Sequence, residues 1–161
     1  MRALRCLAYG EPEGLVVENL PPLVPGVGEV LVDVAAASVN YPDVLLVRDE
    51  YQVSIAPPFT PGSDFAGTIR TLGPDVTGWA LGDRVCGTVF VGAFAEEVVA
   101  STAMLIRVPD RIVVRVRERG REEDFLADLR GAIGQLDVRG AGRRARRTSR
   151  ATARSRAPAG R

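Results

Sequence analysis

A short stretch of the 161-residue sequence, residues 57–69, brings a hydroxyl and a carboxylate next to a rigid turn. It reads PPFTPGSDFAGTI, so Pro61 and Gly62 stand directly before Ser63 and Asp64. Proline fixes φ and lacks an N–H donor, and glycine adopts backbone angles closed to other residues. We therefore expect residues 61–64 to shape the wall of a site, with Asp64 as a buried acid. A proline-rich turn before an ordinary strand is the alternative.

Two further side chains have the chemistry of a ligand-binding wall. The amide of Asn40 donates and accepts hydrogen bonds, and the phenol of Tyr51 is a donor. Each also has an ordinary structural explanation. Asn40 stands where a helix cap would, shortly before a proline and an acid, and Tyr51 could be a packed surface aromatic. Asp64 could likewise bond within its own turn, so the residues alone leave these alternatives open.

Soft metal ligands are almost absent from the chain. Cys6 and Cys86 are its only cysteines, and there is no histidine. A structural zinc needs about four Cys or His ligands, and a catalytic zinc about three protein ligands that usually include His. We therefore expect no zinc or other metal site. We expect both cysteines to be buried strand residues, the alternative being a disulfide between them.

Short strands and one short helix must position these residues. The alternation of apolar and polar residues, together with the Gly and Pro punctuation, predicts a helix and seven strands. The helix is expected to begin at residues 40–43, where Asp43 would complement its positive end, and to break at residues 50–52. The strands are expected at residues 2–9, 15–19, 29–36, 65–69, 84–91, 92–99 and 105–108. This pattern indicates a mainly β (α+β) domain of barrel type.

Six segments of the sequence match a known family in their order and in their spacing. They are ASVNYPDVLL, EYQ, PFTPGSDFAGTI, GDRV, GAFAEEVV and VPD. They resemble the N-terminal, GroES-like catalytic domain of medium-chain dehydrogenases/reductases, in the zinc-independent quinone oxidoreductase branch. The resemblance covers residues 1–110 and implies a GroES-like distorted β-barrel with one or two short helices. In the zinc alcohol dehydrogenase branch the turn would read Gly-His-Glu, and Ser63 here replaces that metal-binding His.

The resemblance also implies a function. Such a domain forms one wall of a cleft whose other wall is a Rossmann domain that binds NADPH, and hydride passes to a quinone or an enone. It places Asn40 on the nicotinamide side, and Tyr51 and Tyr41 in the substrate cleft. The site-shaping turn would comprise Pro61, Gly62, Ser63 and Asp64. No residue is assigned as catalytic, and this chain alone is expected to be inactive and to bind no NADPH.

The second part of the sequence has a different character. Residues 1–110 carry a net charge of −8, whereas residues 111–161 carry +9. We interpret residues 111–138 as an uncertain strand or helix extension and residues 139–161 as a disordered basic tail. Residues 140–145 fit GxGxxA, but the apolar stretch before them is too short for a dinucleotide-binding strand. Our hypothesis is that a frameshift or a mispredicted gene end lies shortly after Asp110, and that the intact reading frame continues into a Rossmann domain.

Partners and location follow from the same features. The alternative function is a stand-alone β-rich module whose basic tail binds nucleic acid or another polyanion non-specifically. Aromatic residues do not interleave the arginines, which disfavours nucleic acid as a partner. No apolar run reaches the ~18 residues of a membrane span, so a cytoplasmic protein is expected. In the family a returning C-terminal segment completes the first domain, so we expect exposed strand edges and self-association.

Overall fold

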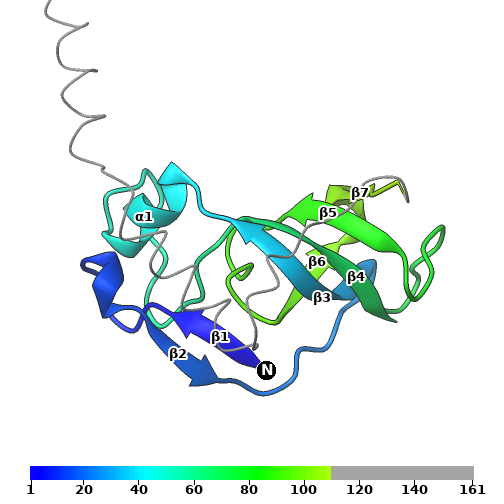
Figure 1. The fold of residues 1–161 in the computed structure, drawn as a ribbon, viewed down its shortest axis with the longest axis horizontal. Helices are drawn as coiled ribbons and strands as arrows, with labels where there is room; N and C mark the ends of the chain where they lie inside the picture. The colour runs from blue at the N-terminus through cyan, green and yellow to red at the C-terminus, as the bar shows by residue number, and fades with distance from the viewer. Residues whose placement is uncertain (110–161) are drawn as a thin grey trace, which may run out of the picture.

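The computed structural model describes residues 1–109, which form two antiparallel sheets and one α-helix (Figure 1). The predictions made for residues 110–161 lie outside the described residues. The helix is α1 (Tyr41–Val47), and two short 3₁₀ turns are η1 (Pro12–Gly14) and η2 (Thr102–Met104). The strands are β1 (Arg2–Arg5), β2 (Val16–Asn19), β3 (Glu29–Ser38), β4 (Asp64–Leu72), β5 (Arg84–Thr88), β6 (Glu97–Ser101) and β7 (Leu105–Arg107). This mainly β architecture confirms the predicted fold class.

The larger sheet has five strands in the order β6-β3-β4-β5-β7, and β1 and β2 form a separate two-stranded sheet. In the view of Figure 1, α1 lies to the left and β5 and β7 to the right, with β3 and β4 running between them. Strands β3 and β4 therefore connect the two sides of the domain. Their paired ends, Ser38 of β3 and Asp64 of β4, lie opposite each other close to the start of α1.

Strand β3 forms over a valine-rich segment in which Val30, Val32 and Val34 alternate with Leu31, which is also buried, and with Asp33. Val30 and Val32 point into the core with no exposed surface, while Asp33 is exposed. β-Branched residues suit a pleated surface that is buried on one face. The strand begins at Glu29 as predicted and continues beyond the predicted end to Ser38.

Helix α1 begins where the sequence predicts it. Asn40 has extended backbone angles, and the Asp43 carboxylate accepts a hydrogen bond from its N–H, which is one half of a capping box. A proline in the first turn costs the helix nothing, because the N–H groups there have no intrahelical partner. The helix ends at Val47, so residues 50–52 follow it as expected. Among residues 1–109 no helix is long and apolar enough to cross a bilayer.

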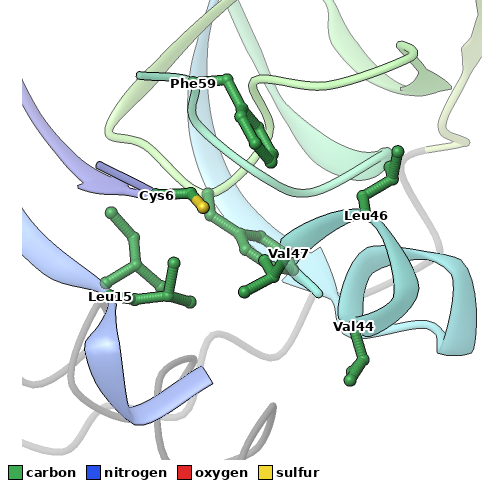
Figure 2. Packing of buried hydrophobic residues seen from close by; sticks show 8 residues of the cluster. Cys6, Leu15, Val44, Leu46, Val47 and Phe59 are labelled. Carbon is green, nitrogen blue, oxygen red and sulfur yellow. The ribbon is translucent and has the colours of Figure 1, made fainter. Parts of the chain in front are cut away.

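The core consists of two clusters of buried side chains. The first gathers α1, the β1–β2 side of the domain and the loop around Phe59, and Figure 2 shows Leu15, Cys6, Phe59 and Val47 converging there. The second lies against one face of the five-stranded sheet and includes Val32, Phe65, Ile69 and Val85. Ala93 belongs to the second cluster and its neighbour Phe94 to the first, so the chain passes from one cluster to the other at this point.

The predicted bounds of four strands are wrong. Strand β4 runs from Asp64 to Leu72 instead of over residues 65–69, and β5 ends at Thr88 instead of at residue 91. The errors in the two other strands have a visible structural reason. The first was expected to run to residue 9 but ends at Arg5, because Cys6 instead forms an isolated bridge with Phe59. Extended structure was expected from residue 92, but β6 begins only at Glu97. The backbone N–H groups of Ala93 and Phe94 are bonded to the turn at residues 61–62 instead of to a neighbouring strand. Both errors have one cause, because contacts from distant parts of the sequence took the backbone groups that a longer strand would have used.

Candidate functional site

The predicted site residues of the turn and the helix start meet at the junction of β3, α1 and β4. Ser38 ends β3, Asn40 precedes α1, and Asp64 begins β4. Ser38 and Asp64 are cross-strand partners, so their side chains leave the sheet on the same face. The fold thus brings together segments that are more than twenty residues apart in the sequence.

Asp64 is the acceptor at the centre of this junction. Its Oδ2 accepts a hydrogen bond from Asn40 Nδ2 at 2.9 Å and one from Ser38 Oγ at 3.2 Å. Asn40 Nδ2 also donates to Ser38 Oγ at 3.3 Å. This pattern of acceptors assigns the amide nitrogen of Asn40, and not its oxygen, to the side facing Asp64. The prediction of a buried acid at position 64 is wrong, because Asp64 is partly exposed at the start of its strand.

The buried acid is Asp43, which has no exposed surface. Its Oδ2 accepts the backbone N–H of Asn40 at 2.7 Å, and its Oδ1 accepts the Ser63 hydroxyl at 3.3 Å. Burial raises the pKa of the Asp43 carboxyl, and the negative charge of Asp64 raises it further. The hydrogen bonds from Asn40 and Ser63 oppose this rise in the pKa. Asp43 therefore gains a proton more readily than an exposed aspartate.

The turn at residues 61–64 has the rigid geometry that its sequence predicts. Gly62 has φ of +95°, and a Cβ placed there would lie 2.3 Å from Cδ1 of Phe94. Only glycine fits both the backbone angle and the contact. The carbonyls of Pro61 and Gly62 accept hydrogen bonds from the N–H groups of Phe94 and Ala93, each at 3.0 Å. The turn is thereby fixed against the segment that links the two core clusters.

The two tyrosines are placed away from this network. Tyr51 is half-buried and packs against the first core cluster, and its hydroxyl accepts a hydrogen bond from Gln52 Nε2 at 3.4 Å. Tyr41 is the first residue of α1 and is exposed. Within residues 1–109 no hydrogen bond joins either tyrosine to Asn40 or Asp64. Their assignment to a substrate cleft remains a prediction.

Sequence reasoning missed two members of the network. It assigned Asp43 only to the positive end of the helix, and it did not single out Ser38. The spacing of Asn40 and Asp43 is that of a capping box, which would have predicted their mutual contact. No local pattern predicts the pairing of Ser38 with Asp64, because that pairing depends on the β3–β4 register.

The site offers hydroxyl, amide and carboxylate groups. Among residues 1–109 no three Cys, His, Asp or Glu side chains lie together as a metal-binding group. The network can orient a polar ligand through hydrogen bonds, and the pKa of its buried carboxyl, Asp43, is raised by burial. These are the capacities of a polar wall built from serine, asparagine and aspartate side chains.

The sequence profile described as "Alcohol dehydrogenase GroES-like domain" matches residues 26–110, more than half of the chain. The chain belongs to this family. Residue 40 and residues 61–64 of this chain lie at the junction described above. The observed sheets agree with the GroES-like fold that the sequence resemblance implied. The prediction of a quinone oxidoreductase-like member of the medium-chain dehydrogenases/reductases is confirmed by the similar proteins.

Among similar proteins is the mouse quinone oxidoreductase-like protein 2, which is 36% identical over 111 residues, covering 69% of this chain and 31% of the mouse protein. A mycobacterial protein, solved as a complex with NADPH, is 32% identical with a TM-score of 0.65, over 70% of this chain and 35% of that one. The human synaptic vesicle membrane protein VAT-1 homolog-like protein is 27% identical with a TM-score of 0.69, over 70% of this chain and 37% of that one. The chain thus spans about a third of the length of these relatives.

Proposed function

We propose that this domain forms the substrate-side wall of an NADPH-dependent oxidoreductase that transfers hydride to a quinone or an enone. The observation that carries the proposal is the hydrogen-bonded network of Asn40, Asp64 and Ser38. Asn40 is the member of this network that the family resemblance assigns to the nicotinamide side. The amide of Asn40 and the carboxylate of Asp64 would position the cofactor ring and the acceptor. NADPH would supply the hydride, and the residues of this chain would supply orientation and hydrogen bonds.

We propose that the chain alone neither binds NADPH tightly nor reduces quinones, because the region that matches the family is its GroES-like domain and not its dinucleotide-binding domain. Titrating NADPH into the purified chain and following NADPH fluorescence tests this directly. We expect no saturable quenching. Tight binding, with a dissociation constant near ~1 μM or about 8 kcal/mol, would contradict the proposal.

A chimera tests whether this domain supports hydride transfer once a dinucleotide-binding domain is supplied. Residues 1–109 would be joined to the dinucleotide-binding domain of the mycobacterial relative that was solved with NADPH. We expect NADPH oxidation when 1,4-naphthoquinone is added, and we expect Asn40→Ala to lower kcat/KM at least tenfold. The matched control is Asn19→Ala, which changes an exposed asparagine in β2. A folded chimera that binds NADPH but reduces neither the quinone nor an enone would refute the proposed function.

We also propose that hydride transfer at this site proceeds without zinc. The position that would hold a metal-binding His in the zinc branch is Ser63, whose hydroxyl instead donates to Asp43. We expect elemental analysis of the purified chain to give well under one zinc per chain, before and after dialysis against a chelator. A zinc content near one per chain would overturn this expectation.

A further inference from the structure

Asp43 connects two segments that otherwise meet only at the site. One carboxylate oxygen holds the backbone of Asn40 before α1, and the other holds the hydroxyl of Ser63 before β4. Asn40 is the donor to Asp64, and Ser63 is its neighbour in the chain. The Asp43 side chain therefore holds both Asn40, which donates the hydrogen bond, and Ser63, which is next to the acceptor Asp64.

The contact with the Asn40 backbone also sets the direction of the Asn40 side chain. The N–H of Asn40 is bonded to Asp43, and φ and ψ are −116° and 158°. Fixing the backbone fixes the direction of the Cα–Cβ bond, from which the amide reaches Asp64 at 2.9 Å. Without Asp43, the amide would lose the constraint that keeps its nitrogen directed at Asp64.

Helix capping alone does not require this arrangement. A capping acid in the first helical turn is effective at an exposed position. Asp43 is instead fully buried, and the negative charge of Asp64 on β4 acts on it unfavourably. Burying one carboxylate beside another costs stability, and costs of this kind concentrate at functional sites. Two hydrogen bonds offset only part of that cost.

We propose that Asp43 is the positioning residue of the candidate site, holding Asn40 and Ser63 so that the Asn40 amide nitrogen stays directed at Asp64. The proposal rests on the proposed function only in treating this network as the ligand-facing wall. It makes Asp43 act through Asn40, without touching substrate or cofactor itself.

The test is NMR of the side-chain amides in the full 161-residue chain, labelled with ¹⁵N. The sequence contains only two asparagines and two glutamines, so four amide pairs are expected, and Asn40→Ser identifies the pair of Asn40. Asn19 is exposed and serves as the internal reference. We expect the Asn40 pair to be shifted from that of Asn19 and to exchange with water at least threefold more slowly.

Three variants then separate positioning from general stability. Asp43→Ala removes both acceptors, so the Asn40 pair should move toward the reference and lose its slow exchange. Asp43→Asn keeps an oxygen for the Asn40 N–H, and its NH₂ can donate to the Ser63 hydroxyl, so it should preserve the wild-type signature. Ser63→Ala removes one contact and should give an intermediate shift. Asp75→Asn, in an exposed loop, is the control that should change nothing.

The outcomes are decisive in either direction. If the Asn40 pair is the same in folded Asp43→Ala as in the wild type, Asp43 does not position it. If Asp43→Ala does not fold, Ser63→Ala decides, and an unchanged Asn40 pair there overturns the proposal. No NADPH or quinone enters the experiment. An inactive chimera would therefore refute the proposed function without altering this result, and an unmoved Asn40 amide would refute the positioning role without altering the chimera.

Discussion

At the scale of single residues, the site depends on two positions that tolerate little change. Gly62 lies in a backbone conformation that side chains disfavour, and it faces the ring of Phe94. Asp43 carries a carboxylate into a position without solvent contact. The first residue fixes the path of the turn, and the second fixes the side chains around it.

Gly62→Ala should destabilise the domain by about 2–4 kcal/mol, because the new methyl group adds both backbone strain and a clash in the core. Urea unfolding followed by circular dichroism measures the loss. The matched control is Gly14→Ala, where no atom lies within 4 Å of the new Cβ and φ is not positive. If Gly62→Ala were as stable as the control, the turn would not be constrained as described.

Asp43 should also leave a signature in the pH dependence of stability. Because its pKa is raised in the folded protein, the native state binds the proton more tightly than the unfolded state does. The contribution of Asp43 to stability is therefore greatest at low pH, and it decreases as pH rises from the ordinary aspartate pKa of about 4 through the raised value.

The unfolding free energy of the wild type, minus that of Asp43→Asn, should thus decrease as pH rises through that window. Urea melts at intervals between about pH 4 and pH 7.5 measure it, and the subtraction cancels the opposite contributions of Asp83 and Glu96, whose pKa values are lowered. A constant difference over the whole range would mean that the pKa of Asp43 is not raised.

At the scale of elements, strands β3, β4 and β6 are joined by charge as well as by backbone hydrogen bonds. Asp33 and Glu97 are directly opposite each other on β3 and β6, which brings two negative charges together. Arg70 of β4 lies between them, with Nη1 3.1 Å from Asp33 and Nη2 2.8 Å from Glu97. The sheet therefore uses one guanidinium to offset a repulsion that its own register creates.

Arg70→Ala should lower the unfolding free energy by about 1 kcal/mol, since Glu97 is largely buried while Asp33 and Arg70 are half-exposed. Adding Glu97→Gln should recover part of the loss, because it removes one of the two opposed charges. Urea unfolding of the two single variants and the double variant gives the coupling energy. Thr71→Ala is a suitable exposed neighbour as control. Strictly additive effects would show that Arg70 does not bridge the strands.

Elements with strong local signals were predictable from the sequence. The valine alternation of β3 and the proline, asparagine and acid around α1 act through neighbours in the chain, so the local sequence was sufficient. The site was predicted in part: the turn at Pro61–Gly62 and the helix start at Asn40 were identified separately. Their contact through Ser38 and Asp43 depends on the β3–β4 register, which no local pattern specifies. The same limit explains why the lengths of the strands at residues 2–9 and 92–99 were wrong.

At the scale of the whole molecule, the described part of the chain leaves strand edges available. β6 and β7 are the outermost strands of the larger sheet, and β2 pairs only with β1 in the smaller one. Ile106 in the middle of β7 is 68% exposed. A strand edge with an apolar side chain is a template for pairing with another chain.

We therefore expect the purified chain to associate at increasing concentration, as sedimentation velocity between about 5 and 200 μM would show. Ile106→Lys should reduce the association, because charge on an edge strand opposes pairing. Thr71→Lys is the matched control, because it adds the same charge at an exposed position on β4, which is a central strand of the sheet and not an edge. A chain that remains monomeric over this range would contradict the expectation.

The passage of the chain from one core cluster to the other at Ala93 and Phe94 limits how this sequence can vary. Both residues are bonded through their backbone to the turn that carries Ser63 and precedes Asp64. A change of volume in either cluster that displaces this pair would also displace the turn, even when the changed residue lies far from the network. Substitutions in one cluster should therefore be accompanied by compensating substitutions in the other. A change of side-chain volume in the core that is not compensated should alter which ligands the site prefers.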